Sequence, residues 1–209
     1  MAKLPRPRLP LPALTPSALA TLRAGTRIWR VYRTASRHPA SWDTLRHFGP
    51  VAVGRFDHQA PPPHDDPDRG ILYGSADHGD AAIVEAFQDT GLIDRVLDSP
   101  WLVAFELTRD VTALDLRGPW PTLAGASQAI ASGRRDTAQA WSRAIYEAYP
   151  TVAALLYPSA MAGRATNVAV YERAGDALPK QPLIHVPLAH PGLEASLNRI
   201  ATTFGYDLR

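Results

Sequence analysis

Residues 71–90 read ILYGSADHGDAAIVEAFQDT, and this stretch decides the fold class. Its first five residues are mainly apolar and predict a strand, whereas residues 77–90 place apolar side chains at helical spacing and predict a helix. Asp77 or Asp80 is expected to cap the start of this helix, and Gly91 follows its end. The stretch therefore predicts a strand that runs directly into a helix.

The sequence on either side adds more strands than helices. Strands are predicted at 26–33, 101–107, 111–116, 152–157, 167–171 and 183–188, and residues 51–57 are predicted as a short strand or a strand-like turn. Helices are predicted at 17–22, twice within 122–149 with a break near Gly133, and at 193–204. Few strand–helix–strand units recur, so we expect an α+β fold with a small, mainly antiparallel β-sheet flanked by helices.

Length and composition indicate one globular domain. The chain has 209 residues, of which 45% are hydrophobic and 20% are charged. Residues 1–24 form a proline-rich N-terminal arm, and residues 25–209 form the domain. Five prolines interrupt residues 1–16, so no secretory signal is expected there. No run reaches the ~18–20 apolar residues of a membrane span, and we expect a cytoplasmic protein.

Several classes of site are excluded or disfavoured by composition. The chain has no cysteine, which excludes disulfides, thiolate metal sites and cysteine nucleophiles. A formal net charge of +2 gives no reason to expect direct nucleic-acid binding. His185 and His190 are the closest histidine pair, but Pro187 and Pro191 break helical spacing between them. No metal site is therefore expected.

Polar residues stand at five places within otherwise apolar patterns: Arg30, Arg55, Tyr73, Glu85 and Ser159. Each has an ordinary structural interpretation as well. Arg30 suits an exposed ion pair. Arg55 could pair with Asp57, Tyr73 could be a core residue, Glu85 a solvated helix residue, and Ser159 a turn residue or cap.

The order of these residues, with their neighbours, forms a family pattern. It consists of Trp29-Arg30-Val31, then Gly54-Arg55-Phe56-Asp57, then Leu72-Tyr73-Gly74-Ser75 with Ala82 and Glu85, then Pro158-Ser159 and the strand that starts at Asn167. Over roughly residues 25–175 the sequence resembles the RES-domain family, which is named for its Arg, Glu and Ser and supplies the toxins of RES–Xre toxin–antitoxin pairs. It departs from the family in having Asp57 for the usual Asn, an insertion at 59–70, and the extra arm.

The resemblance implies a split sheet similar to that of ADP-ribosyltransferases and an enzyme that cleaves NAD⁺ at the nicotinamide–ribose bond. Cleavage would occur by hydrolysis or phosphorolysis and would deplete cellular NAD⁺. It implies catalytic roles for Glu85, Arg55, Tyr73 and Ser159, and NAD⁺ binding by Arg30, Arg55, Tyr73, Ser159 and Asn167. NAD⁺ would be the substrate, with inorganic phosphate as an alternative co-substrate and no other cofactor. The partner implied is a neutralising Xre-like antitoxin, and a homodimer remains open.

The residue types suit this chemistry. A planar guanidinium such as that of Arg30 or Arg55 binds a pyrophosphate through parallel hydrogen bonds. Tyr73 could stack on the flat nicotinamide cation. Glu85 could stabilise the oxocarbenium-like ribose that forms as nicotinamide leaves. Ser159 could position the nicotinamide amide or orient the attacking water or phosphate.

Two alternatives remain at this point. One is an ADP-ribosyltransferase that modifies a protein or nucleic acid, although the chain lacks the ExE or QxE arrangement at Glu85 that such enzymes often use. The other is a non-catalytic NAD-binding module, which the departure at Asp57 favours.

Overall fold

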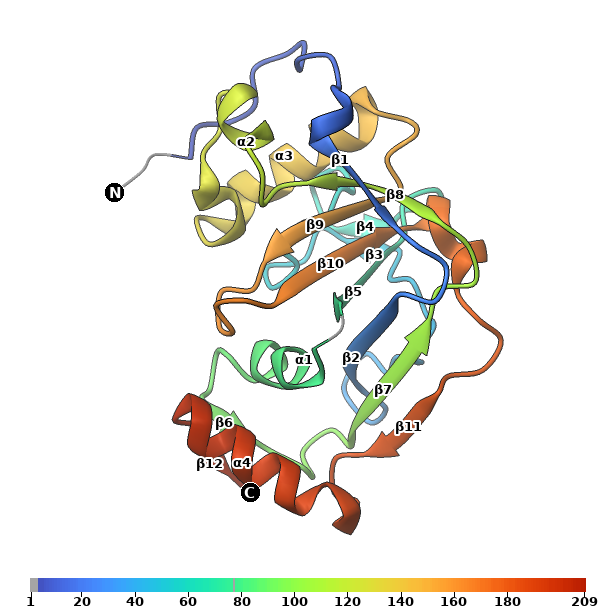
Figure 1. Cartoon of the computed structure of the whole chain (residues 1–209), viewed down its shortest axis with the longest axis vertical. Coiled ribbons are helices and arrows are strands. Elements are labelled where there is room, and N and C mark those ends of the chain that lie inside the picture. Colours follow the sequence, from blue (N-terminus) through green and yellow to red (C-terminus); the bar gives the residue numbers. More distant parts are fainter. Residues whose placement is uncertain (1–3, 77) are drawn as a thin grey trace.

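The structure is a computed structural model that describes residues 4–76 and 78–209. Eight strands form its main sheet: β1 (Leu19–Leu22), β2 (Arg27–Arg33), β5 (Ile71–Ala76), β7 (Pro100–Glu106), β8 (Val111–Asp115), β9 (Ala154–Pro158), β10 (Thr166–Tyr171) and β11 (Ile184–Pro187). Their order is β1-β8-β9-β10-β5-β2-β7-β11, and only β8 and β9 pair in parallel within it (Figure 1). The predicted α+β fold with a mainly antiparallel sheet is confirmed.

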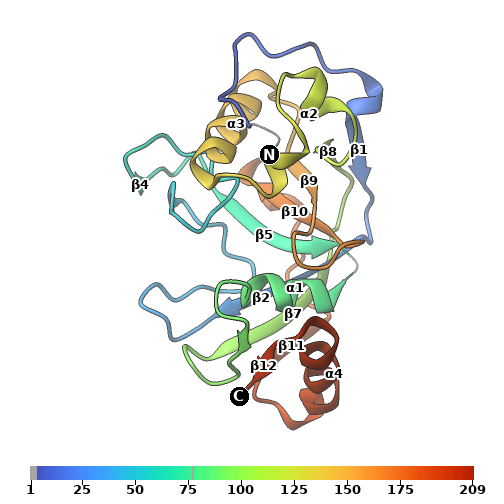
Figure 2. The same ribbon diagram turned by 90° about the vertical axis from the view of Figure 1, so that its left-hand side faces the viewer.

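Helices cover the two halves of this sheet. They are α1 (Gly79–Ala86), α2 (Trp120–Leu123), α3 (Arg135–Ala148) and α4 (Glu194–Phe204). Helices α2 and α3 lie beside β8, β9 and β10, whereas α1 and α4 lie beside β2 and β7 (Figure 2). Two further two-stranded sheets pair β3 (Phe48–Gly49) with β4 (His64–Asp65), and β6 (Leu92–Ile93) with β12 (Asp207–Leu208). Short 3₁₀ helices occupy Pro16–Ala18, Gln128–Ala131, Glu172–Ala177 and Pro191–Leu193.

The main sheet is split between β2 and β5. These strands pair only through Ile28 with Ala76 and Trp29 with Ser75, whereas β2 and β7 pair over the whole length of β2. A Cβ at Gly74 would lie 2.5 Å from the Ile28 Cγ2 atom and 2.9 Å from the Trp29 carbonyl oxygen. Glycine is therefore required where the two strands converge, and beyond this point the sheet opens.

Apolar patterning explains the core on both faces. On β2, Ile28 and Tyr32 pack into one cluster while Trp29 and Val31 pack against another, as the alternation predicts. On α3, Trp141 is fully buried with other side chains of its apolar face. Burial of one such large side chain stabilises the fold by roughly 1.5–3 kcal/mol.

Two local predictions are wrong, and one alternative is decided. Residues 17–22 were predicted to be helical, but Leu19–Leu22 pair with β8 as an edge strand, and this long-range pairing overrides local propensity. Residues 51–57, predicted as a short strand or a strand-like turn, form turns, because the buried Asp57 carboxylate accepts a hydrogen bond from Val51 N and bends the segment back. Helix α1 begins after His78 without a side-chain cap, so Asp80 does not cap it.

Two other expectations concern the ends of this helix. Asp77, the other candidate cap, lies outside the described residues. Gly91 has a φ of +63° and its N–H donates to Phe87 O at 3.0 Å, so it ends the turns that follow the helix.

The N-terminal arm packs on α3. Trp141 Nε1 donates to Pro5 O at 2.8 Å, and the Tyr149 hydroxyl donates to Pro12 O at 2.6 Å. Leu11 from the arm joins the core under α3. In the described part of the chain, no helix combines the length and apolar character needed to cross a bilayer.

Candidate active site

A cleft of about 790 Å³ opens where β2 and β5 separate. Its walls come from β2, β5, α1 and the loop around residues 38–55. Five of the six predicted site residues line it: Arg30, Arg55, Tyr73, Glu85 and Asn167. Ser159 does not line the cleft and instead contacts Glu85 from behind. The split in the sheet therefore gathers residues that are far apart in the sequence.

Glu85 is held in place by a ring of donors. Its Oε1 atom accepts hydrogen bonds from Ser159 Oγ at 2.5 Å, Ala160 N at 3.0 Å and Met161 N at 3.4 Å. Its Oε2 atom accepts one from Gln88 Nε2 at 3.2 Å. These donors fix the orientation of the carboxylate on the cleft wall. Glu85 is consequently not a freely solvated helix residue.

Ser159 is buried and fully engaged in the protein. Its hydroxyl donates to Glu85 and accepts from Met161 N at 3.2 Å and Ala162 N at 2.9 Å. A serine hydroxyl has one proton to donate, and here Glu85 receives it. Ser159 thus orients the carboxylate and caps the turn after β9.

Arg30 places a positive charge in the cleft, and its hydrogen-bond acceptors are backbone carbonyls. Its Nη1 atom donates to Trp42 O at 3.0 Å and Thr44 O at 3.3 Å. Among the described residues, no carboxylate forms an ion pair with it. Burial lowers the pKa of Arg30 to about 10, so the group stays charged at neutral pH. The exposed ion pair that was the ordinary interpretation of Arg30 does not form.

Arg55 is the second guanidinium of this kind. It donates to Gly133 O at 2.7 Å. Asp57 pairs with Arg46 instead, at 2.6 Å, so the ordinary interpretation of Arg55 as the partner of Asp57 is wrong. Burial, and then the neighbouring charge of Arg135, lower the pKa of Arg55. An anion bound between Arg55 and Arg135 would favour the charged guanidinium, and so would oppose the effects of burial and of Arg135 on the pKa of Arg55.

Tyr73 lines the cleft while its hydroxyl is bonded inside the protein. The hydroxyl donates to Asp57 Oδ1 at 2.7 Å and accepts from Phe56 N at 2.8 Å. Burial first, and then the charge of Asp57, raise the pKa of Tyr73 well above its usual value. Tyr73 is thus a neutral phenol that contributes its ring to the cleft.

Asn167 contributes a free acceptor. It lies on β10 between Tyr157 of β9 and Ser75 of β5. Its side chain is buried, and its Oδ1 atom has no hydrogen-bond partner among the described residues. Buried polar atoms are rarely left unpaired unless a ligand or water completes them. Asn167 is therefore suited to receive a donor from a bound ligand.

Sequence reasoning missed several polar cleft residues, among them Arg46, Gln88, Arg135 and Tyr157. Arg46 lies in a segment for which no helix or strand was predicted, and Tyr157 was assigned to the strand predicted at 152–157. Gln88 lies one helical turn after Glu85, and this spacing was the one signal that could have found it.

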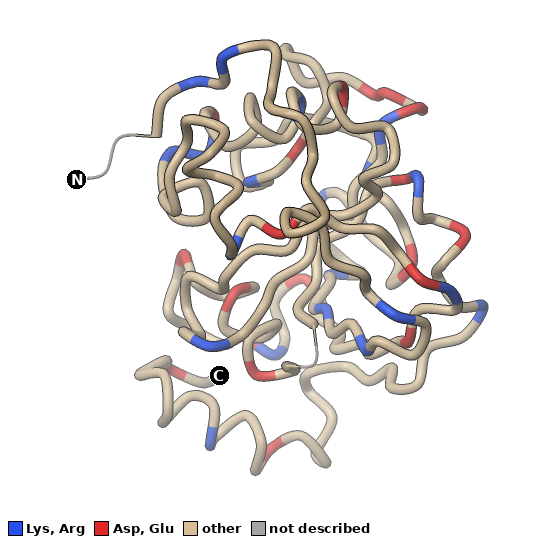
Figure 3. Tube along the Cα trace, turned by 45° about the horizontal axis from the view of Figure 1, so that its top comes forward, with Lys and Arg blue, Asp and Glu red and all other residues tan. Residues whose placement is uncertain are grey.

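Charge in the cleft is mainly positive, although the protein as a whole is nearly neutral. Basic and acidic residues are interspersed along the chain and do not form one basic face (Figure 3). Among the described residues, no group of three or more His, Asp or Glu side chains is arranged to hold a metal ion. The arrangement can bind an anion beside a fixed carboxylate and an aromatic ring.

Comparisons with known proteins identify the family and a similar fold. The sequence matches the RES domain family over residues 27–190, so the chain belongs to the RES-domain family. A chain from the crystal structure of the M. tuberculosis MbcT–MbcA toxin–antitoxin complex has a similar fold, with a TM-score of 0.56 and 21% sequence identity. This similarity covers 86% of the present chain and 92% of that chain. The comparison with curated proteins returned no match. The predicted family is confirmed.

Proposed function

We propose that this protein cleaves NAD⁺ at the nicotinamide–ribose bond in the cleft between β2 and β5. One observation carries the proposal: two arginines that form no ion pair with a carboxylate of the described residues share the cleft with a carboxylate that four donors hold in place. A dinucleotide presents the complementary groups, because it joins an anionic pyrophosphate to a ribose on which positive charge develops.

Arg30 and Arg55 would bind the pyrophosphate. A guanidinium that hydrogen-bonds only to backbone carbonyls keeps its full charge available for a ligand. Charge-assisted hydrogen bonds to phosphate are roughly twice as strong as neutral ones. The Tyr73 ring would stack on nicotinamide, and Asn167 Oδ1 would accept a hydrogen bond from the substrate.

Glu85 would stabilise the transition state. As the bond from ribose C1′ to the nicotinamide nitrogen breaks, its electron pair leaves with neutral nicotinamide, and the ribose gains oxocarbenium character. A carboxylate fixed beforehand stabilises this charge without reorganising during the reaction. Ser159, which donates to Glu85, would act as a positioning residue and would not contact nicotinamide or the acceptor.

The acceptor would be water or inorganic phosphate. Either supplies an oxygen that bonds to C1′, and the proton of an attacking water passes to solvent. The products would be ADP-ribose or its 1″-phosphate, together with nicotinamide.

We further propose that the protein acts as a toxin that depletes NAD⁺ and is neutralised by an Xre-like antitoxin. The similar solved chain comes from a toxin–antitoxin complex. Phe48 and Val53 line the cleft with 45% and 68% of their surface exposed, which suits contact with a protein partner.

An NAD⁺ consumption assay tests the proposal. Purified protein is incubated with NAD⁺ with and without phosphate, beside Glu85→Ala, and the products are identified by mass. Loss of NAD⁺ with wild type alone supports the proposal, and the product distinguishes hydrolysis from phosphorolysis. Intact NAD⁺ under both conditions would contradict it, and label transferred to a macromolecule would indicate an ADP-ribosyltransferase instead.

A further inference from the structure

A fully buried carboxylate lies directly behind the cleft wall. Asp57 has no exposed surface, and it accepts three hydrogen bonds. Its Oδ1 atom receives the Tyr73 hydroxyl at 2.7 Å and Arg46 Nη2 at 2.6 Å, and its Oδ2 atom receives Val51 N at 2.7 Å. The residues that supply these three donors all line the cleft.

For Tyr73, these contacts settle which part of the side chain a ligand can meet. The phenol hydroxyl has one proton, which goes to Asp57, and it also accepts Phe56 N. Both bonds point away from the cleft toward buried residues, Asp57 and Phe56. The aromatic ring is left as the surface that Tyr73 contributes to the cleft.

For Arg46, the contacts determine where its charge lies. Nη2 donates to Asp57 and Nη1 donates to Phe48 O, so both terminal nitrogens are bonded within the protein. A buried carboxylate is costly unless a cation and further donors accompany it. Because Asp57 is fully buried, its carboxylate requires a counter-ion, and Arg46 supplies it.

We propose that Asp57 is a positioning residue that fixes the conformation of the substrate-binding wall of this enzyme. It holds the Tyr73 ring and the Arg46 guanidinium in fixed positions relative to the turn at Val51. Asp57 itself does not contact the substrate. This assignment rests on the proposed function, because the substrate whose binding is affected is NAD⁺.

The rival explanation is that Asp57 and Arg46 form an ion pair that only stabilises the fold. The two explanations differ in what a conservative variant changes. Asp57→Asn keeps the shape but loses the charge, and Tyr73→Phe keeps the ring but loses the hydroxyl that Asp57 holds. If Asp57 positions the ring, both variants misplace the same group, so their effects on NAD⁺ binding are coupled.

The test is a double-mutant cycle on NAD⁺ cleavage with thermal unfolding measured in parallel. We expect Asp57→Asn and Tyr73→Phe each to raise KM for NAD⁺ about tenfold, and the double variant to raise it no more than the stronger single variant. Glu172→Gln is the control, because it alters a hydrogen-bonded carboxylate outside the cleft and should lower Tm with KM unchanged.

Three outcomes would overturn the assignment. One is that both single variants lower Tm and leave KM and kcat as in wild type. Another is that their effects on KM multiply in the double variant. Either result, with active wild type, removes the positioning role and leaves the proposed function intact. The third outcome, no NAD⁺ cleavage by wild type, contradicts the proposed function and this assignment together.

Discussion

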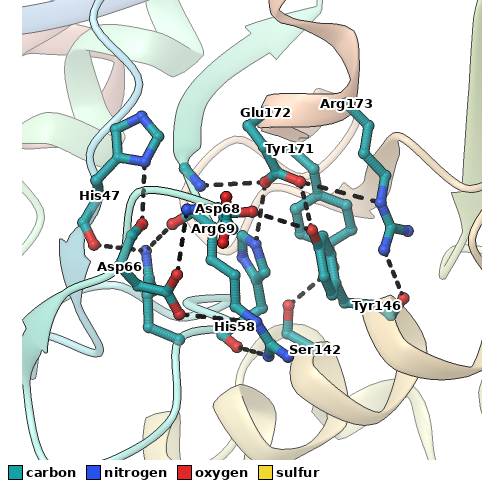
Figure 4. Close-up of polar contacts among 12 residues, drawn as sticks. His47, His58, Asp66, Asp68, Arg69, Ser142, Tyr146, Tyr171, Glu172 and Arg173 are labelled. Carbon is teal, nitrogen blue, oxygen red and sulfur yellow. Dashed lines mark hydrogen bonds and ion pairs between the residues drawn. The ribbon is translucent and has the colours of Figure 1, made fainter.

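Two polar regions of this molecule contain the same kinds of side chain but use them differently. One is the cleft, and the other is a closed network that joins the 59–70 insertion to α3 and Glu172 (Figure 4). The closed network consists of His58, Arg69, Ser142, Tyr146, Tyr171, Glu172 and Arg173. In it, Glu172 accepts hydrogen bonds from Tyr146 at 2.5 Å, Gly70 N at 3.1 Å and His58 Nε2 at 3.3 Å.

Arginines make the contrast clear. Arg173 in the closed network donates to three backbone carbonyls, lies 3.6 Å from the centroid of the Tyr146 ring, and has the Glu172 carboxylate 3.9 Å away. Arg30 in the cleft donates to two backbone carbonyls and lies farther from a ring, 6.0 Å from the centroid of Tyr32, and it forms no ion pair with a carboxylate of the described residues. Charges satisfied within the protein stabilise the fold, whereas a charge left without a counter-ion is available for a ligand.

The largest expected effect is on catalysis. Glu85→Gln keeps the shape of the side chain but removes its negative charge, so we expect kcat for NAD⁺ cleavage to fall by roughly 10²–10³-fold. Ser159→Ala should lower kcat about tenfold, because Glu85 keeps its backbone donor from Ala160. Equal losses in the two variants would show that Ser159 does more than orient Glu85.

The closed network should matter for stability instead. Glu172→Ala leaves His58, Tyr146 and Gly70 N without their acceptor, and we expect the free energy of unfolding to fall by about 3 kcal/mol. Denaturant unfolding measures this loss, and KM for NAD⁺ at low temperature should stay unchanged. Glu106→Ala is the control.

Glu106 forms an exposed ion pair with Arg27, 2.9 Å long, which should be worth less than about 1 kcal/mol. A Glu172→Ala protein as stable as Glu106→Ala would remove the distinction between the two regions.

The cleft arginines should govern substrate affinity. Arg30→Met and Arg55→Met each remove a charge-assisted contact with the pyrophosphate, so we expect KM for NAD⁺ to rise by roughly 10-fold or more. The free energy of unfolding should not fall by a similar amount, because in the part of the chain that the structure describes neither arginine has an ion pair to lose. Arg27→Met, on the opposite face of the same strand, serves as the matched control. A rise in KM for all three variants would point to a nonspecific charge effect.

The smallest effect concerns pH. Burial lowers the pKa of His58 despite its bond to Glu172, so the unfolded chain binds a proton more readily than the folded protein. The stabilisation that His58 contributes is present above the pKa of about 6.5 that it has in the unfolded chain. It is lost as pH falls toward the lower pKa that His58 has in the folded protein.

Glu172 adds to the same trend at lower pH. Burial opposes its ionisation, but hydrogen bonds from His58 and Tyr146 outweigh burial and lower its pKa. Its contribution is present above its unfolded pKa and is lost as pH falls through the folded one. Tm should therefore decrease from pH 7 to pH 4, and His58→Gln should flatten the upper part of this decrease. If the Tm of His58→Gln decreased with falling pH as steeply as that of wild type, this role of His58 in the pH dependence would be contradicted.

Local patterns were sufficient for much of the fold. The alternation on β2, the apolar stripe of α3 and the continuous apolar run of β9 could all be recognised in the sequence. Each is a simple pattern of apolar residues that the structure buries. Residues 17–22 were misjudged, and residues 51–57 could not be assigned to a strand or a turn, for different reasons. The first depends on pairing with β8, and the second on the contact between Asp57 and the Val51 backbone.

The site could be predicted in part for a similar reason. Five ordered polar residues stood out because they interrupt apolar patterns, and the structure brings four of them to the cleft and Ser159 to Glu85. Arg46 could not be predicted as a site residue because it lies in an irregular loop. Nothing in the sequence showed that Asp57 pairs with Arg46, 11 residues away, instead of Arg55.

A crystal structure of Glu85→Gln soaked with NAD⁺ tests the central claim most directly. The account predicts a dinucleotide in the cleft, with its pyrophosphate hydrogen-bonded to Arg30 and Arg55 and its nicotinamide on the Tyr73 ring. An empty cleft at saturating NAD⁺, or a dinucleotide whose pyrophosphate faces solvent away from both arginines, would contradict it.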